Sequence, residues 1–160
     1  MDITASAITP AIAARVANLG AATVGVNAKT ITTLITRLGR KGGRAVLAEI
    51  DGELVGSNVY GDALRFGEVS GHFGLSDEIM SWGRTFLPSF IYLRKDLLSQ
   101  GMSSTIRSAR DADAVKQGYK YGLVLGSATP AIHTWAVREG DTELKGFADM
   151  YGQPVFIHKL

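Results

Sequence analysis

One stretch, residues 86–127, constrains the fold of this chain more than any other. Residues 86–93 are rich in aromatic and branched side chains, which favours a β-strand. A short turn of small and polar residues follows at 99–104, then a helix that ends at Gly118 and a nearly all-apolar strand at Tyr121–Leu125. The stretch therefore predicts a strand, a turn, a helix and a second strand, with the amino end of the helix close behind the first strand.

The turn at residues 99–104 is a candidate anion site. The first N–H groups of a helix have no partner within the helix, and the helix dipole favours negative charge at the same end. A phosphate or diphosphate is the ligand that such a turn takes most readily. The alternative is an ordinary helix start that binds nothing.

The helix after Gly101 is predicted to be amphipathic. Its apolar residues recur at helical spacing, so they are expected to share one face that points to the core. That face contains Met102, Ile106, Ala109, Ala112 and Val115. The face that points to solvent is expected to carry the charged residues Arg107, Arg110, Asp111 and Lys116.

The amino-terminal part predicts a strand followed by two helices. Residues 2–9 alternate weakly, and Pro10 then opens a helix that is expected to close at Gly20. Asn27 is the expected cap of a second helix, which is expected to stop at Gly39.

Two pairs of strands are predicted beyond the unit at 86–127. The dipeptide Asp51-Gly52 joins the β-rich runs 45–50 and 54–60, and this dipeptide suits a tight type I′ hairpin turn. Residues 144–149 and 154–159 can form a closing pair of strands.

The composition of the 160 residues predicts one soluble globular domain over residues 1–160, with 46% hydrophobic and 20% charged residues. The chain has no cysteine, and its three histidines have no metal-ligand spacing, so no metal site is expected. No apolar run approaches the roughly 18 residues of a membrane helix. Asp2 and Arg15 argue against an export signal, so a cytoplasmic location is expected.

A basic cluster interrupts the apolar amino-terminal half. It consists of Arg37, Arg40, Lys41 and Arg44, with three glycines between them. The net charge of +2 is too small to indicate nucleic-acid binding by itself. The cluster is consistent with contact to a nucleic-acid backbone or an acidic acceptor, and also with a solvated loop.

In the order of its elements, the chain resembles the GNAT superfamily of acyl-CoA-dependent N-acyltransferases along nearly its whole length. In that family the fourth strand ends in an apolar triplet, and Arg/Gln-x-x-Gly-x-Gly/Ala opens the following helix. The matching residues here are Ile91-Tyr92-Leu93 and Leu98-Ser99-Gln100-Gly101-Met102-Ser103. Gly101 is retained, whereas Leu98 replaces the basic or amide residue and Ser103 replaces the second small residue.

The resemblance implies an α/β (α+β) fold, with a mixed, mostly antiparallel sheet that is flanked by about four helices and splayed between strands four and five. It implies acetyl-CoA as the acyl donor, with its diphosphate on the backbone N–H groups of the turn. The residues implied to bind the donor are Ile91, Leu93, Ser99, Gln100, Gly101, Met102, Ser103, Ser104, Thr105 and Thr129.

The implied reaction is direct attack of a primary amine on the thioester, with N–H groups near Leu93 polarising the carbonyl. Candidates for the proton transfers are Tyr92, Ser127 and His133, although packing, capping and surface roles explain these residues equally well. His72, Phe73 and Trp82 are candidates for an acceptor pocket or, alternatively, a satellite hydrophobic cluster.

Two other functions remain open on the sequence. The substituted motif is consistent with a catalytically silent protein of this fold that acts in structure or partner binding. The basic cluster is consistent with an enzyme that modifies nucleic acid. The expected partners are acetyl-CoA and an amine acceptor, with a homodimer left open and no membrane association.

Overall fold

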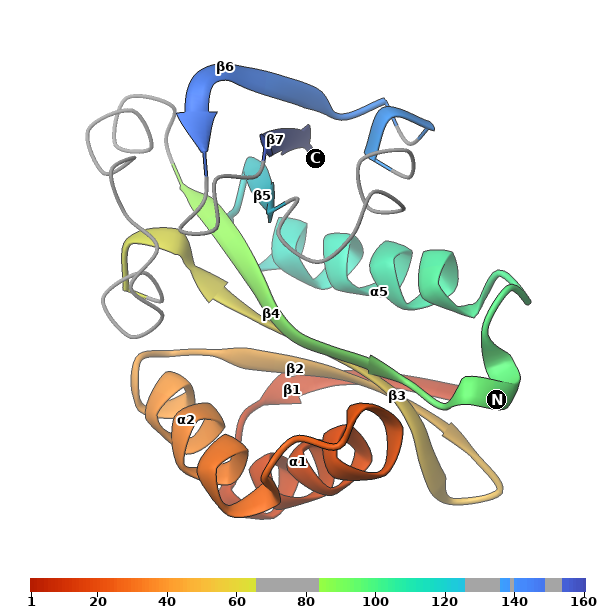
Figure 1. Cartoon of the computed structure of the whole chain (residues 1–160). Helices are drawn as coiled ribbons and strands as arrows, with labels where there is room; N and C mark the ends of the chain where they lie inside the picture. Colours follow the sequence, from red (N-terminus) through yellow and green to blue (C-terminus); the bar gives the residue numbers. More distant parts are fainter. Residues whose placement is uncertain (66–83, 126–135, 139, 149–153) are drawn as a thin grey trace. The chain divides into compact units, whose positions relative to one another are not determined.

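The computed structural model describes residues 1–65, 84–125, 136–138, 140–148 and 154–160. Seven strands pair into one sheet in the order β1-β2-β3-β4-β5-β7-β6 (Figure 1). The strands are β1 (Asp2–Ala7), β2 (Arg44–Ile50), β3 (Glu53–Asp62), β4 (Thr85–Leu93), β5 (Tyr121–Leu125), β6 (Thr142–Ala148) and β7 (Pro154–Lys159). The helices that lie wholly within the described part of the chain are α1 (Pro10–Val24), α2 (Ala28–Arg40), the 3₁₀ turn η1 (Lys95–Leu97) and α5 (Met102–Lys116).

The expected mixed and mostly antiparallel sheet is confirmed. Every strand pair whose register is described is antiparallel except β4 with β5, which run parallel. None of the helices in the described part of the chain combines the length and the apolar character that a membrane crossing requires.

The described chain divides into two compact units. The first contains Met1–Gly61 and Pro88–Asp113, and the second contains Asp62–Leu87 and Ala114–Leu160. The first unit therefore holds β1, β2, all but the last residue of β3, most of β4, the helices α1 and α2, and most of α5. The expectation of one domain over residues 1–160 stays a prediction.

In the first unit, α1 and α2 lie on one face of the strands and α5 lies on the other (Figure 1). Two glycines show how closely these layers approach. A Cβ added to Gly20 of α1 would lie 2.6 Å from the ring of Tyr92 in β4. A Cβ added to Gly56 of β3 would lie 2.5 Å from Cδ1 of Ile106 in α5. The core of this unit is therefore packed on both faces of its strands.

Helix α1 starts as predicted and ends later than predicted. The hydroxyl of Thr9 caps its first turn, and Pro10 is its first residue. The helix ends at Val24, and Gly25, whose φ of 72° is left-handed, caps it. The predicted end at Gly20 is wrong, because this glycine lies inside the helix and makes room for the ring of Tyr92.

The second helix and the hairpin follow the sequence prediction. Asn27 caps α2, since its Oδ1 accepts a hydrogen bond from the backbone N–H of Thr30 at 3.0 Å. The helix ends at Arg40, one residue past the predicted glycine. Asp51 and Gly52 have φ values of 52° and 78°, and a type I′ turn requires positive values at both positions.

The predicted faces of α5 are wrong in part: Ile106 is buried and Lys116 is exposed as expected, but other residues are not. Arg107 and Arg110 were expected to point outward but are only 4% and 2% exposed, whereas Val115, expected in the core, is 55% exposed. Asp111 explains part of this burial: its carboxylate lies 2.6 Å from Nη2 of Arg110 and 3.7 Å from Nε of Arg107. Buried guanidinium groups need such a counter-charge. The spacing of apolar residues along α5 does not reveal this pairing of Arg107 and Arg110 with Asp111.

In the second unit, β5 lies between the first residues of β4 and β7. Thr85 pairs with Tyr121, and Phe86 pairs with Gly122. A Cβ added to Gly122 would lie 2.4 Å from the ring of Phe86, so the glycine makes room for this ring. The splay expected between the fourth and fifth strands stays a prediction.

The closing strands also match the prediction closely. β7 has the predicted bounds, and β6 begins at Thr142, two residues before the predicted start. Asp141, whose side chain is fully buried, lies just before β6 and is 2.6 Å from Nδ1 of His158 in β7. This contact ties the start of β6 to the end of β7.

Candidate functional site

The segment between β4 and α5 carries the predicted donor site. Ser99 and Gly101 have φ values of 65° and 76°, so the chain reverses sharply before α5 begins at Met102. Ser99, Gln100 and Gly101 are all exposed. A Cβ added to Gly101 would have no neighbour within 4 Å. The space on the side of Gly101 where a side chain would lie is therefore free of other described residues, its two chain neighbours apart.

Hydrogen bonds hold this turn in shape. Nε2 of Gln100 donates to the carbonyl oxygen of Asp96 at 2.7 Å. The backbone N–H and the hydroxyl of Thr105 both donate to the carbonyl oxygen of Gly101, each at 3.2 Å. The N–H groups of the first three residues of α5 have no partner inside the helix. The turn thus combines fixed carbonyl groups with a row of N–H donors at the amino end of α5.

The last residues of β4 lie in different environments. Ile91 is 57% exposed, Tyr92 is buried and Leu93 is half-buried. The backbone N–H of Arg94 donates to the carbonyl oxygen of Val55 in β3 at 2.8 Å. Because successive N–H groups of an extended chain point to opposite edges, the N–H of Leu93 points away from β3. This is the edge at which the resemblance places the thioester carbonyl.

Tyr92 lies with its ring against Gly20 of α1. Burial raises the pKa of the Tyr92 hydroxyl above its usual value, so this phenol is neutral at neutral pH. A neutral phenol can donate a proton but does not readily accept one. The packing role that the sequence allowed for Tyr92 is what the structure shows, and its role in catalysis stays a prediction.

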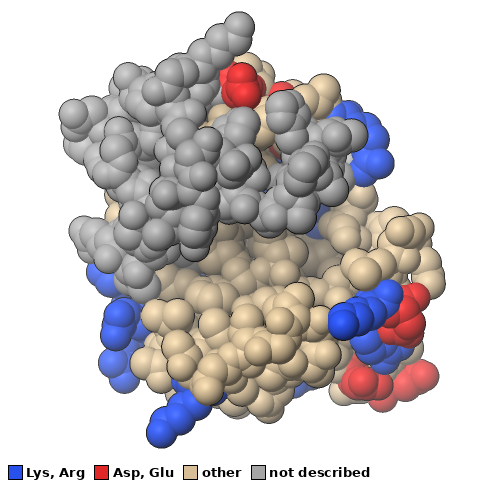
Figure 2. Space-filling model, in the orientation of Figure 1, with Lys and Arg blue, Asp and Glu red and all other residues tan. Residues whose placement is uncertain are grey.

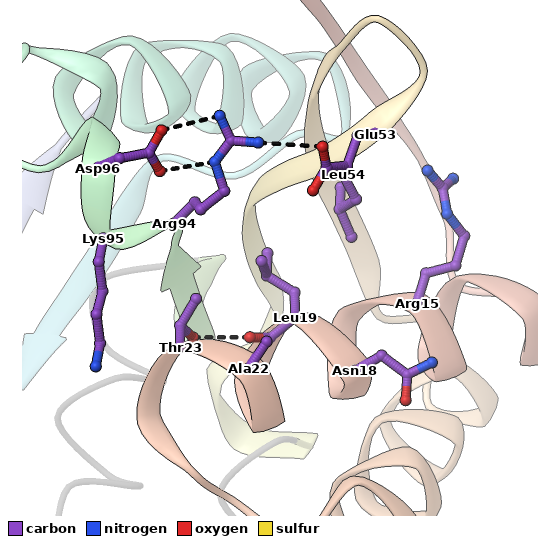
Figure 3. Close-up of a pocket in the computed structure, with 10 residues that line it drawn as sticks. All are labelled: Arg15, Asn18, Leu19, Ala22, Thr23, Glu53, Leu54, Arg94, Lys95 and Asp96. Atoms are coloured by element: carbon purple, nitrogen blue, oxygen red, sulfur yellow. Dashed lines mark hydrogen bonds and ion pairs between the residues drawn. The ribbon is translucent and has the colours of Figure 1, made fainter.

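A pocket of about 580 Å³ lies in the first unit beside this segment (Figure 3). It is lined by residues of α1, of β3 and of the segment after β4: Arg15, Asn18, Leu19, Ala22, Thr23, Glu53, Leu54, Arg94, Lys95 and Asp96. A pocket of this size can hold a small organic molecule.

Arg94 joins two parts of the pocket wall, as Figure 3 shows. Its Nε and Nη2 donate to the two carboxylate oxygens of Asp96 at 2.7 and 3.0 Å, and its Nη1 donates to Glu53 at 3.2 Å. The hydrogen bond from Arg94 lowers the pKa of Asp96, which therefore stays ionised at neutral pH. Asp96 is thus a structural partner of Arg94 and a poor base.

The sequence reasoning did not find this arrangement. Arg94 and Asp96 stand two residues apart directly after a predicted strand, which was an available signal for a pair of charges. Glu53 lies 41 residues before Arg94, and nothing in the local pattern connects the two.

Six of the predicted site residues lie outside the described part of the chain. These are the catalytic candidates Ser127 and His133, the donor-binding candidate Thr129, and the acceptor candidates His72, Phe73 and Trp82. Their roles stay predictions.

Arg44 does not belong to an exposed basic cluster. Its Nε and Nη2 donate to the carboxylate of Asp113 in α5 at 2.6 and 3.0 Å, and the hydroxyl of Tyr60 donates to the same carboxylate at 2.5 Å. As the first residue of β2, Arg44 lies beneath α5 and is held by a buried acid. Arg37 and Arg40 remain exposed on the last turn of α2.

At the level of sequence, no protein-family model and no curated protein matches the chain. Solved structures match it over nearly its whole length. A proposed acetyltransferase of the GNAT family from Desulfovibrio desulfuricans has a TM-score of 0.64 at 17% identity, with 99% of this chain and 97% of that chain covered. The chain has the GNAT fold.

Other proteins with the GNAT fold support this assignment. A proposed acetyltransferase from Salmonella typhimurium, solved with its cofactor acetyl-CoA, has a TM-score of 0.61 at 15% identity, with 100% and 94% of the two chains covered. A ribosomal-protein-alanine N-acetyltransferase from Brucella melitensis biovar Abortus has a TM-score of 0.59 at 18% identity, with 86% and 90% covered. The fold expected from the resemblance is confirmed.

Proposed function

We propose that this protein is an N-acyltransferase that moves an acetyl group from acetyl-CoA to a primary amine. The observation that carries the proposal is the open turn between β4 and α5 in a chain with the GNAT fold. Its two residues of left-handed conformation, Ser99 and Gly101, leave the amino end of α5 accessible. A chain of the same fold was solved with acetyl-CoA as its cofactor.

The donor is held by residues on both sides of the turn. We assign its diphosphate to the N–H groups at the start of α5, supported by the turn residues Ser99 and Gln100 and by the hydroxyls of the first helical turn. Ile91 and Leu93 are assigned to the arm of the donor, because they are among the last residues of β4 before the turn and Ile91 is 57% exposed. The exposure of Gly101 and the free space around it fit a group that lies directly against the backbone.

The residues of this chain then position the reaction and stabilise charge. Acetyl-CoA supplies the acetyl group as a thioester, whose carbonyl carbon forms a bond to the amine nitrogen while the bond to sulfur breaks. The N–H of Leu93 is assigned to the oxygen that gains negative charge. The amine reacts in its uncharged form, and its nitrogen loses one proton as the amide forms. Tyr92, a neutral phenol, is assigned as the donor of the proton that the departing thiolate takes, and it regains a proton from the amine nitrogen through solvent.

The pocket beside Arg94 is our candidate for the acceptor amine. It adjoins the segment that leads from β4 into the donor turn, and Arg94 fixes its wall through Asp96 and Glu53. Leu19 and Leu54 provide apolar surface in the same pocket, so a small amine with an apolar part fits its lining.

Titration calorimetry with acetyl-CoA, and release of CoA in the presence of a panel of primary amines, test the proposal. The decisive variant is Gly101→Val, because a branched side chain at this left-handed position blocks the turn. Gly42→Val is the matched control, since Gly42 also has a positive φ of 82° and free space around it but lies in a different turn. We expect Gly101→Val to lose acetyl-CoA binding and Gly42→Val to keep it.

Two results contradict the proposal. Equal affinity of the wild type and Gly101→Val for acetyl-CoA would remove the donor site from this turn. Tight acetyl-CoA binding without CoA release on any amine would favour the catalytically silent alternative.

A further inference from the structure

One face of α2 carries a row of exposed basic side chains, Lys29, Arg37 and Arg40, which we call the α2 stripe. At 100° per residue these three positions lie within about 80° of one another around the helix, and they span roughly 16 Å along its axis. Within the described part of the chain, none of the three forms an ion pair. The α2 stripe is therefore a line of uncompensated positive charge.

The sequence around the α2 stripe contains no acid. No Asp or Glu occurs anywhere in residues 3–48, which include α1, α2 and their connections. In Figure 2, Lys and Arg side chains follow the lower left edge, where Figure 1 places α2, and no Asp or Glu is visible among them. Positive potential on this side of the unit is thus reinforced by the absence of nearby carboxylates.

The structure changes the membership of the basic group that the sequence indicated. Arg44 is removed, because Asp113 holds it beneath α5, and Lys41 is removed, because it follows the last residue of α2. Lys29 is added, because it lies on the same helical face as Arg37, two turns before it. The group is therefore one face of a regular helix rather than a glycine-rich loop.

The surroundings of the α2 stripe indicate the class of its partner. Two large apolar residues of α2, Ile35 and Leu38, are buried within the unit. Ile31 and Leu34 are half-buried, and at 100° per residue they lie about 60° or more around the helix from the α2 stripe, so the stripe itself has no apolar anchor for a protein or a membrane. The exposed neighbours on the helix surface are hydroxyl residues, Thr30 and Thr33. Basic side chains with hydroxyls, and without apolar anchors, are the usual contacts of a phosphodiester backbone.

We propose that the α2 stripe binds the sugar-phosphate backbone of a nucleic acid without reading its base sequence. The inference is independent of acyl transfer, because it involves neither the donor turn nor the pocket. Three basic contacts release counterions on binding, so the logarithm of the affinity for a duplex falls with the logarithm of salt concentration at a slope of about −2.7. Between 50 and 200 mM salt this slope corresponds to a loss of about 40-fold.

Fluorescence anisotropy with the full chain and a labelled duplex of about 20 base pairs, made once as DNA and once as RNA, tests this proposal. The Arg37→Gln/Arg40→Gln variant removes two contacts and keeps helix-forming residues, so the slope is expected to shrink to about −0.9. Lys116→Gln/Lys120→Gln is the matched control, because it removes two exposed charges outside α2. We expect this control to bind as the wild type does.

Three outcomes overturn the proposal. The first is no binding of either duplex at 50 mM salt. The second is an equal loss of affinity for the duplex in the two double variants, which would mean that the duplex is attracted to positive charge anywhere on the surface. The third is displacement of the duplex by polyglutamate at equal charge concentration, which would identify an acidic protein as the partner. Preference for DNA or for RNA would identify the source of the phosphodiester.

Discussion

Nε of Arg44 lies 2.6 Å from Oδ2 of Asp113, and this pair joins the first residue of β2 to α5 across 69 residues of sequence. The hydroxyl of Tyr60 donates to the same carboxylate oxygen at 2.5 Å. The side chains of Arg44 and Asp113 are 21% and 11% exposed, so the contact is screened only partly by solvent. It fastens α5 to the strands on one face of the first unit.

Replacing the acid of this pair is expected to destabilise the fold. Asp113→Asn keeps the shape of the side chain but leaves the guanidinium of Arg44 partly buried beside a neutral amide. We expect the free energy of unfolding to fall by about 2–3 kcal/mol, measured by urea denaturation. Asp2→Asn is the control, because it makes the same change of charge at an exposed residue. Its free energy of unfolding should stay within about 0.5 kcal/mol of the wild-type value. A similarly small effect at Asp113 would contradict the assigned role.

Tyr60 is expected to make stability fall at high pH. Burial, followed by the hydrogen bond and the charge of Asp113, raises the pKa of Tyr60 well above 10 in the folded state. The unfolded chain then loses this proton at lower pH than the folded chain does. The contribution of the Tyr60 hydroxyl to the free energy of unfolding is therefore complete below about pH 10. Above that pH it declines by up to about 1.4 kcal/mol per pH unit.

Urea denaturation from pH 8 to pH 11 measures this effect, with Tyr60→Phe as the comparison. The variant lacks the titrating hydroxyl, so its stability should decline less steeply above about pH 10 than that of the wild type. Parallel curves for the two proteins would show that Tyr60 does not have the assigned pKa shift.

Ser99 is expected to be the most strained residue of the donor turn. Its φ of 65° is costly for a residue with a Cβ and is freely available to glycine. Ser99→Gly should therefore raise the free energy of unfolding by about 0.5–1 kcal/mol. Ser103→Gly, in the first turn of α5, is the matched control and should lower it by a similar amount. If both changes have the same sign, the turn does not have the geometry described.

Arg94 is expected to influence acceptor binding more than stability. Its ion pairs are largely exposed, so Arg94→Gln should change the stability little. Under the proposed function, the loosened pocket wall should raise the KM for the amine by about tenfold while the affinity for acetyl-CoA is kept. Arg15→Gln is the control, since Arg15 lines the same pocket but pairs with Glu49. An equal effect on both substrates would place Arg94 outside the acceptor site.

The parts of the fold that the sequence predicted are those whose causes are local. Asn27 caps α2 and Asp51-Gly52 turns the hairpin because each acts on backbone groups within a few residues. The expected stop at Gly20 failed because the reason for this glycine is the ring of Tyr92, which lies 72 residues further along the chain. A glycine that admits a distant ring has the same sequence appearance as a glycine that ends a helix.

The distinction between local and distant causes applies also to the charged residues of α5 and to the candidate functional site. Arg107 and Arg110 were assigned to solvent because an apolar pattern treats every charge as exposed, and their pairing with Asp111 overrides that pattern. The turn between β4 and α5 was predicted from its own small and polar residues, and its role as the donor site stays a prediction. The wall of the pocket was not found, since it depends on contact between Arg94 and Glu53.

The turn at Asp51-Gly52 also bears on how the chain reaches its final form. β2 and β3 meet across two residues, so pairing them requires almost no loop closure, and hairpins of this kind form in about 1–10 μs. The contact between Arg44 and Asp113 instead closes a loop of 69 residues. We therefore expect this hairpin to be an early scaffold in folding and α5 to dock onto it late.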